Sequence, residues 1–186
     1  MGNKGEKTKE IIRQEAYRLF AEKGFQRVTM TDICEKTGLS RGGVYRYYSS
    51  TGDIFSQILS EKTAARQMEQ GKSPAVILEE LLEEMKHEIL DRESSLSLAT
   101  YEYANLGNQD FFIELNHKAQ EKWQQFISHG IETGEFADVD PRQMAELILY
   151  YYQGLRMWSR VIPFGEQEGD NFAETIRRML LRNDAP

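Results

Sequence analysis

Two arginines and three tyrosines occur within residues 40–48, and the chemistry that they offer is recognition of nucleic acid. A guanidinium group donates hydrogen bonds to O6 and N7 of guanine together, and both acceptors face the major groove of DNA. Arg41 and Arg46 are therefore candidates for reading bases, with contact to phosphate alone as the alternative for each. Gly42 and Gly43 lie between them, although each glycine costs a helix roughly 1 kcal/mol relative to alanine. Two glycines here indicate a close approach of this helix either to DNA or to a neighbouring helix.

The residues before this segment predict two helices that would support it. Apolar residues at helical spacing predict a first helix over Thr8–Lys23, which Gly24 ends. Thr29 followed by Asp32 forms a capping-box pattern that opens a second helix, and Gly38 closes it. Short helices joined by such glycine-containing connections are typical of a helix-turn-helix unit packed on a supporting first helix.

Residues 40–48 would form the recognition helix of that unit, with Ser40 as its N-cap. The N-terminal part of a recognition helix faces base edges. Val44 and Tyr48 are expected to pack inward. A longer helix over residues 51–68 follows and opens with the same capping pattern.

The charge of the chain is unevenly distributed along the sequence. The formal net charge is -7, but residues 1–50 carry ten Lys and Arg against six Asp and Glu. The rest of the chain carries thirteen Lys and Arg against twenty-four Asp and Glu. This asymmetry is expected of a basic head that meets phosphates and an acidic body that faces away from them, with uneven surface charge as the plain alternative.

The sequence argues against several other classes of protein. No stretch approaches the roughly 18 consecutive apolar residues of a membrane helix, and the N-terminus lacks the apolar segment of a signal peptide, so we expect a cytoplasmic protein without a membrane partner. The single cysteine, Cys34, is interpreted as a small buried apolar residue, with a reactive thiol as the alternative. No phosphate-binding glycine loop, metal-binding histidine pair or nucleophile motif is found, so no enzyme, metal site or cofactor is predicted.

Three runs, Val28–Cys34, Gly38–Tyr48 and Asp53–Ile54, carry many matches in one register. Together they resemble the DNA-binding domain of the TetR family of transcriptional regulators. Ala16–Phe25 is similar to the first helix of that family and its Gly-Phe exit. Gly130–Pro141 is similar to the turn before the penultimate helix of the family.

The helical pattern and the resemblance predict an all-α protein. An N-terminal three-helix helix-turn-helix DNA-binding domain is expected at residues 1–50, and a C-terminal helical ligand-binding and dimerisation domain at residues 51–186. The residues expected to contact DNA lie on the second helix and the recognition helix: Thr29, Thr31, Ser40, Arg41, Gly42, Gly43, Tyr45, Arg46 and Tyr47.

Alternatives stay open at Thr29 and at the two residues that follow the DNA-binding domain. Thr29 serves as a helix cap, as a phosphate contact, or as both. Thr51-Gly52 stands where the family often has a lysine, so one phosphate contact is either missing or supplied by Lys4, Lys7 or Lys9.

Helical periodicity continues through the rest of the chain. The expected helices open at Ser73-Pro74, lie around Leu96–Ala104 and Asp110–Thr133, restart at Asp140-Pro141 and end with about Asn171–Arg182. An apolar pocket for a small molecule would draw on aromatic, sulfur-bearing and acidic residues, with burial in the core as the alternative for each aromatic residue. Glu102 would orient a cationic ligand or lie on a solvated face. The candidate ligand contacts are Met85, Tyr101, Glu102, Tyr103, Phe112, Trp123, Phe126, Tyr150 and Trp158.

The resemblance implies that the last two helices pair with their copies in a homodimer, although their apolar stripes would also suit an internal core. The candidate dimer contacts are Met144, Leu147, Tyr151, Leu155, Ile176, Met179 and Leu180. Two recognition helices about 34–36 Å apart would read a near-palindromic double-stranded operator.

The function implied by the resemblance is a sequence-specific repressor that a small-molecule inducer releases from its operator. The helix at residues 51–68 would transmit the change. A DNA-binding regulator without an inducer, acting as an activator or a constitutive repressor, is the alternative.

Overall fold

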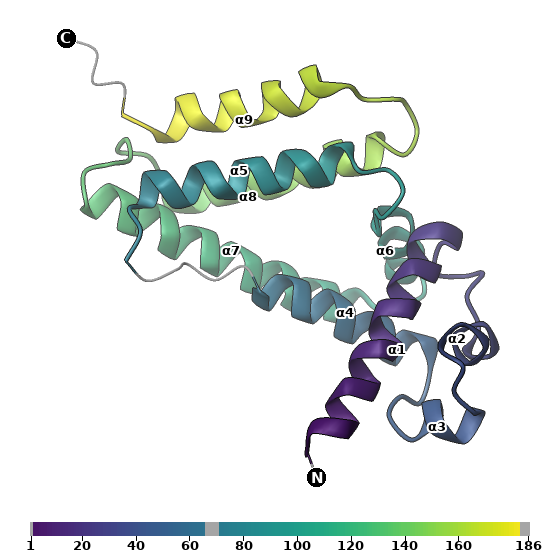
Figure 1. Ribbon diagram of the computed structural model, residues 1–186. Coiled ribbons are helices and arrows are strands. Elements are labelled where there is room, and N and C mark those ends of the chain that lie inside the picture. The colour runs from purple at the N-terminus through teal and green to yellow at the C-terminus, as the bar shows by residue number, and fades with distance from the viewer. Residues whose placement is uncertain (1, 66–70, 183–186) are drawn as a thin grey trace. The chain divides into compact units, whose positions relative to one another are not determined.

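The computed structural model describes residues 2–65 and 71–182, and its elements within these ranges are helices. The only other regular pairing among the described residues is an isolated antiparallel bridge between Phe136 and Leu181. The all-α prediction is therefore confirmed. The helices are α1 (Gly2–Lys23), α2 (Met30–Thr37), α3 (Arg41–Tyr45), α4 (Thr51–Ala65), α5 (Pro74–Leu90), α6 (Ser97–Ala104), α7 (Gln109–Glu132), α8 (Pro141–Trp158) and α9 (Glu166–Leu180) (Figure 1).

The described residues form two compact units. Unit 1 contains α1 to α4 together with Glu93–Ile113, a segment that holds α6 and the first turn of α7. Unit 2 contains α5, the part of α7 that begins at Glu114, α8 and α9. Both α4 and α6 pack against α1 inside unit 1. The division at residue 50, into a DNA-binding domain and a ligand-binding and dimerisation domain, stays a prediction.

Capping residues place several helix starts where the sequence predicts them. Ser73 caps α5 and Asp140 caps α8, and each is followed by a proline in the first turn. The recognition helix α3 is shorter than residues 40–48, because the chain leaves the helix in a turn after Tyr45. The predicted end of the next helix at residue 68 lies outside the described residues.

Two predicted helix starts are wrong. α1 begins at Gly2 rather than Thr8, since no residue of its lysine-rich first turns interrupts the helix. α9 begins at Glu166 rather than Asn171, because the side chain of Glu168 accepts a hydrogen bond of 2.8 Å from the backbone N–H that precedes the helix.

Unit 1 is built around the apolar face of α1. Ile12, Ala16 and Phe20 are fully buried, as their helical spacing predicts. The Phe20 ring packs edge-on against Phe55 of α4, with centroids 4.8 Å apart, and lies 5.5 Å from the Phe25 ring. These three rings fix the helix-turn-helix and α4 on the same face of α1.

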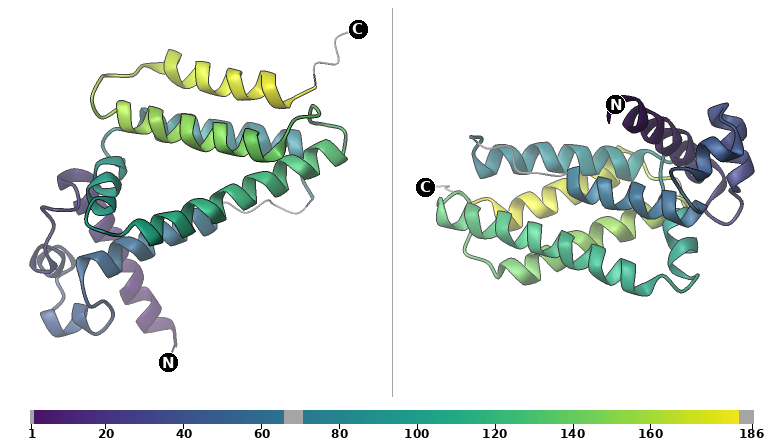
Figure 2. Two further views of the ribbon diagram at one scale, coloured as in Figure 1. Left: turned by 180° about the vertical axis from the view of Figure 1, so that it is seen from behind. Right: turned by 90° about the horizontal axis from the view of Figure 1, so that it is seen from below.

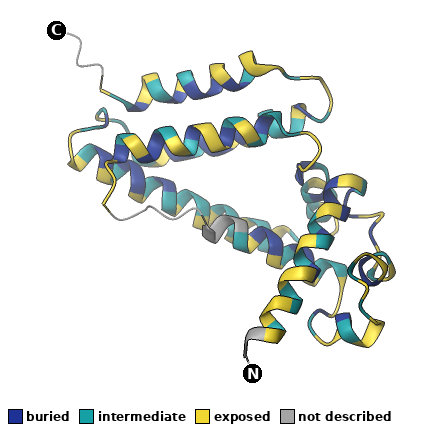
Figure 3. Ribbon diagram, in the orientation of Figure 1, coloured by how far each residue is buried: buried dark blue, intermediate teal, exposed yellow. Residues whose placement is uncertain are grey.

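Unit 2 is a helical bundle in which α5 packs against both α9 and α8 (Figure 2). Each of these helices turns a buried face inward and an exposed face outward (Figure 3). Three residues of α7 join the same core, namely Trp123, Phe126 and Ile127. None of the helices within residues 2–65 and 71–182 combines the length and the apolar character needed to cross a lipid bilayer.

The loop between α7 and α8 ties several helix ends together inside unit 2. Phe136 is fully buried against Gly130, where an added Cβ would overlap the Phe136 ring. The Ala137 N–H donates to Leu180 O at the end of α9 (2.7 Å). The Glu135 carboxylate accepts a hydrogen bond of 3.0 Å from the backbone N–H of Ala75 at the start of α5. The sequence similarity at Gly130–Pro141 therefore corresponds to a loop that joins the ends of α5, α7, α8 and α9.

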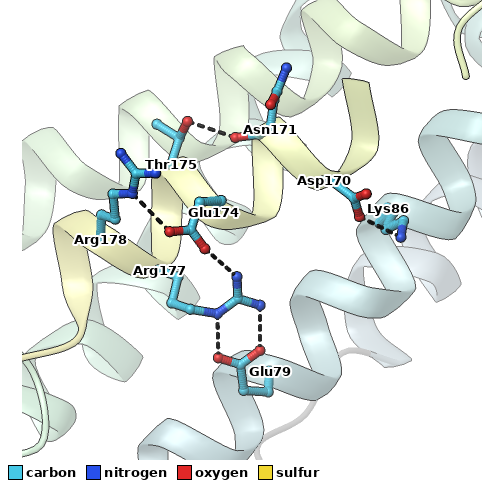
Figure 4. A network of polar contacts seen from close by, with 8 residues as sticks. All are labelled: Glu79, Lys86, Asp170, Asn171, Glu174, Thr175, Arg177 and Arg178. Atoms are coloured by element: carbon cyan, nitrogen blue, oxygen red, sulfur yellow. Dashed lines mark hydrogen bonds and ion pairs between the residues drawn. The ribbon is translucent and has the colours of Figure 1, made fainter. Parts of the chain in front are cut away.

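Ion pairs join α9 to α5 along the side of this bundle (Figure 4). Arg177 donates from Nε and Nη2 to the two carboxylate oxygens of Glu79, at 2.8 and 2.7 Å, and from Nη1 to Glu174 at 2.9 Å. The Arg177 guanidinium lowers the pKa of the Glu79 carboxyl below its usual value. Lys86 pairs with Asp170 at 2.6 Å.

Candidate nucleic-acid interface

The start of α2 is held by a reciprocal cap, as the sequence predicts. The Thr29 side chain accepts a hydrogen bond from the Asp32 N–H (3.1 Å), and the Asp32 carboxylate accepts one from the Thr29 N–H (2.8 Å). The Thr29 hydroxyl donates to the same carboxylate. Lys23 of α1 lies 3.2 Å from the other carboxylate oxygen of Asp32. These hydrogen bonds lower the pKa of the Asp32 carboxyl to about 2, and the one from the Thr29 hydroxyl has the largest effect.

The capping contacts of Thr29 bear on whether this residue can also contact a phosphate. Its backbone N–H and its hydroxyl both bind Asp32, so the protein already satisfies the donors that Thr29 would offer to a phosphate. Thr31 is exposed, and its hydroxyl oxygen accepts a hydrogen bond of 3.0 Å from Arg41 Nη2. Arg41, one of the two candidates for reading bases, is therefore held against α2 by this hydrogen bond.

The recognition helix exposes polar side chains and buries apolar ones. Ser40 caps α3 by accepting a hydrogen bond of 3.2 Å from the Gly43 N–H. Val44 is fully buried and Tyr48 is 7% exposed, which confirms that both pack inward. Arg41, Tyr45 and Arg46 are exposed, and the Arg46 guanidinium lies 5.5 Å from the centre of the Tyr47 ring.

The two glycines of α3 differ in what surrounds them. Around Gly42, an added Cβ would meet no atom within 4 Å. At Gly43 it would lie 3.3 Å from Ser40 Oγ and 3.6 Å from Leu39 Cβ, both within the same turn of the chain. Neither glycine is therefore required by packing against α1. The remaining explanation from the sequence is a close approach to DNA.

Arg13 is a residue of this unit that the sequence did not single out. Its Nη1 donates to the Tyr48 hydroxyl (3.2 Å), and its Nε lies 2.8 Å from a carboxylate oxygen of Glu61 on α4. One side chain of α1 therefore holds the end of the recognition segment and α4 together. The i, i+3 spacing of Glu10 and Arg13 was the signal available in the sequence for an ion pair, which the structure places at 2.5 Å.

The candidate ligand contacts do not form one cluster within either unit. Met85, Trp123 and Phe126 belong to the core of unit 2. Tyr150 and Trp158 are exposed residues of α8. The side-chain amide nitrogens of Asn116 and Gln120 each lie 3.5 Å from the Tyr150 hydroxyl. The other candidates lie in unit 1: Tyr101, Glu102, Tyr103 and Phe112.

Two surface depressions are lined by described residues, and both are open to solvent. The first, of about 420 Å³, is lined by the polar side of α7, and the second, of about 470 Å³, by the first turns of α1. Neither includes a candidate ligand contact. In the described parts of the chain, no three His, Cys, Asp or Glu side chains gather to hold a metal ion. Cys34 is buried, in keeping with the interpretation of a small apolar residue.

The candidate dimer contacts divide into buried and surface residues. Met144, Ile176 and Leu180 are at most 4% exposed within the core of unit 2. Leu147 and Met179 are 41% and 42% exposed. The exposed residues are the ones that remain available to a second copy of the chain.

A helix-turn-helix that exposes Arg41 and Tyr45 on its second helix, and Arg46 directly after it, is typical of the DNA-binding element of a transcriptional regulator. Residues 12–58 match the family model described as bacterial regulatory proteins, tetR family. Residues 71–183 match the tetracyclin repressor-like C-terminal domain. The two models cover most of the chain, so the protein belongs to the TetR family of transcriptional regulators and is not an enzyme.

One transcriptional regulator is similar to this chain in sequence, and solved structures are similar to it in fold. The uncharacterized HTH-type transcriptional regulator YfiR of Bacillus subtilis is 27% identical, with 96% of this chain and 92% of that protein covered. The reduced form of Escherichia coli NemR is similar in fold, with a TM-score of 0.78 at 12% identity over 96% of this chain and 100% of that one. NalD, the secondary repressor of the MexAB-OprM multidrug efflux pump in Pseudomonas aeruginosa, has a TM-score of 0.65 at 18% identity, covering 98% and 100%.

Proposed function

We propose that this regulator is a homodimeric repressor that acts in the cytoplasm and leaves a near-palindromic operator when a small molecule binds. The observation that carries the proposal is the division of α3 into two faces. Val44 is fully buried against the rest of unit 1, whereas Arg41, Tyr45 and Arg46 face solvent. Helical relatives of this fold include a protein described as a repressor.

Support for a homodimer comes from the exposed side of α8. Leu147, Gly154 and Trp158 are exposed and recur at helical spacing, with Tyr151 and Leu155 partly exposed beside them. An added Cβ at Gly154 would meet no atom within 4 Å, so the fold of one chain does not require this glycine. A glycine in the middle of a helix costs roughly 1 kcal/mol. Close packing of a second helix against α8 would explain its presence.

The proposal of an inducer rests on the family and on the apolar character of unit 2. A regulator without an inducer is the alternative, and the two depressions do not distinguish between them, because neither is lined by the candidate ligand contacts. An inducer that acts through α4 must change the position of that helix, Thr51–Ala65, when it binds.

The first experiment is to select binding duplexes from a random-sequence pool and to measure affinity by fluorescence anisotropy at several salt concentrations. Arg41→Ala should weaken binding to the selected duplex by roughly tenfold or more, since a bidentate contact to guanine contributes about 1–3 kcal/mol of discrimination. Arg18→Ala, which removes an exposed arginine of α1, is the matched control. Selection of no preferred sequence, or equal losses for both variants, would contradict the proposal.

The second experiment screens metabolites for thermal stabilisation of the protein and then for release of the selected duplex. A ligand that binds the repressor and not its unfolded chain raises the midpoint of unfolding. The inducer reading requires that at least one stabilising ligand also weakens operator binding. If every stabilising ligand leaves operator affinity unchanged, the regulator without an inducer is the correct reading.

A further inference from the structure

The helix α6 belongs to the unit that contains the helix-turn-helix, although it follows that motif by many residues in the chain. It packs against α1 within unit 1. The Tyr17 hydroxyl of α1 donates a hydrogen bond of 2.8 Å to Ser94 O, just before α6. These contacts bring two adjacent residues of α6, Glu102 and Tyr103, against the helix-turn-helix.

Glu102 meets the connection between α1 and α2. Its Oε2 accepts a hydrogen bond of 3.0 Å from the backbone N–H of Gln26. Gly24 ends α1 with a φ of +79°, and an added Cβ there would lie 2.7 Å from Glu102 Oε2. The glycine therefore serves both the left-handed turn and the close approach of the carboxylate. The Glu102 side chain holds the chain at the point where it enters the helix-turn-helix.

Tyr103 meets the other end of the same motif. Its ring lies 4.6 Å from the Phe25 ring and 5.2 Å from the Phe55 ring, centre to centre. An added Cβ at Gly52, in the first turn of α4, would lie 3.3 Å from Tyr103 Cε2. Burial, with the charge of Asp53 nearby, raises the pKa of the Tyr103 phenol, which also hydrogen-bonds to Ser56. The Tyr103 ring therefore covers the place where the chain leaves the recognition segment and enters α4.

We propose that Glu102 and Tyr103 are positioning residues that hold the entrance and the exit of the helix-turn-helix in the geometry that binds the operator. We call this pair the α6 clamp. It rests on the proposed function, because its effect is on operator recognition. Neither residue is on α2 or α3, so the clamp sets the orientation of the recognition helix without contacting DNA itself.

The clamp also accounts for the glycine at position 52. A larger residue at this position would displace the Tyr103 ring by a few tenths of an ångström. Motion of α6 would act directly on both ends of the motif.

Glu102→Ala tests the first contact, Glu102→Gln retains an acceptor oxygen, and Leu106→Ala alters a residue just after α6 that is 55% exposed. All are measured below the onset of unfolding, as followed by circular dichroism. Glu102→Ala should lower affinity for the selected operator roughly tenfold, as expected for loss of a hydrogen bond to a charged group, while affinity for a scrambled duplex stays unchanged. Glu102→Gln should restore most of the operator affinity, and Leu106→Ala should match the wild type. Equal operator affinity for Glu102→Ala and Leu106→Ala would overturn the proposal.

A double-mutant cycle tests the second contact. Gly52→Ala should weaken operator binding in the wild-type background and have no effect when Tyr103→Ala has already removed the ring. An equal effect of Gly52→Ala in both backgrounds would show that Tyr103 does not act through this position.

Amide hydrogen exchange separates the clamp from the proposed function, because it requires no DNA. The Gln26 N–H should exchange faster in Glu102→Ala than in Leu106→Ala, since it loses its acceptor. Unchanged exchange would overturn the clamp even if the protein selects an operator. Faster exchange would support it even if the selection of an operator fails, a failure that would contradict the proposed function alone.

Discussion

Gly42 occupies a helix position that alanine would favour, and nothing in the fold of the chain requires a glycine there. An added Cβ at Gly42 would meet no atom within 4 Å. The helix α3 contains only the residues Arg41–Tyr45, so the glycine destabilises a helix that is already short. A residue that lowers the stability of a short helix without relieving a clash is typical of a binding surface. In this unit the surface is the one that exposes Arg41 and Arg46.

Gly42→Ala should therefore have opposite effects on folding and on binding. The free energy of unfolding should rise by about 0.5 kcal/mol, since alanine loses less backbone entropy than glycine in a helix. Operator affinity should fall, because the added methyl group stands between α3 and the groove. Thermal melts and fluorescence anisotropy on the same preparation measure the two effects. An alanine variant that binds the operator as tightly as wild type would show that close approach is not the reason for the glycine.

Asp32 gives the helix-turn-helix a defined dependence on pH. The pKa of its carboxyl is lowered from 3.8 to about 2 in the folded chain, so the ionised form is favoured by folding. This stabilisation is fully present above the unfolded pKa and is lost as pH falls from about 4 towards 2. Asp32→Ala should lower the free energy of unfolding by about 1 kcal/mol at pH 7, as for other helix caps, and by much less at pH 2. Melts at both pH values test this, and an equal loss at each would contradict it.

At the scale of helices, the sequence predicted the elements whose ends carry their own capping residues. α2, α3, α5 and α8 each begin after a Thr, Ser or Asp whose side chain accepts a backbone hydrogen bond. The first turns of α1 and α9 lack such a signal, and their starts were misplaced. Capping is a local property of a few residues, which is why it can be predicted from the chain alone.

The candidate sites could be predicted from the sequence where they depend on residues that are close together in the chain. The polar face of α3 follows from the spacing of residues within one motif. The role of Glu102 depends on Gln26, which is far from it in sequence, and no periodicity connects the two. The same reason explains why the candidate ligand contacts fall in separate units, since their selection used residue type and not contact.

The ion pairs between α9 and α5 predict a contrast between two neighbouring arginines. Arg177→Ala should lower the free energy of unfolding by about 1 kcal/mol, the upper range for a half-exposed pair, because Arg177 binds both carboxylate oxygens of Glu79 on another helix. Arg178→Ala should cause no measurable change, since among the described residues Arg178 pairs with Glu174 on its own helix. Urea denaturation measures both.

Unfolding measured at low pH provides the control for the effect of Arg177→Ala. The pKa of the Glu79 carboxyl is lowered in the folded chain, so the contribution of the pair is present above the unfolded pKa and disappears as pH falls through the folded value. Wild type and Arg177→Ala should therefore converge in acid. A difference that persists after Glu79 is protonated would assign the effect to packing of the Arg177 stem.

At the scale of the whole molecule, operator recognition by a twofold protein requires a second copy of the chain. The exposed apolar side chains of α8 and α9 are the candidates for that contact. Leu147→Glu should raise the dissociation constant of the dimer by roughly thirtyfold, as for other buried interface anchors, and should weaken operator binding in parallel. Sedimentation velocity over a concentration series measures the dimer.

Val76→Glu is the matched control for this dimer prediction. Val76 is a residue of unit 2 that is 49% exposed, compared with 41% for Leu147, but it lies on α5. It should leave the dimer intact. If both substitutions dissociate the dimer equally, or if neither does, the interface lies elsewhere.

The loop between α7 and α8 makes the two ends of unit 2 unequal in adaptability. At this loop, backbone groups of Ala137 and Leu180 bind directly, and the buried Phe136 ring fills the space above Gly130. At the opposite ends of α5 and α8, the link is made by long side chains, with Arg160 donating to Arg92 O and Arg92 to Arg160 O. Rotamer changes of two arginines can widen that end without breaking the backbone ladder of any helix. The bundle is therefore stiffer at the Phe136 loop than at the end that the two arginines join.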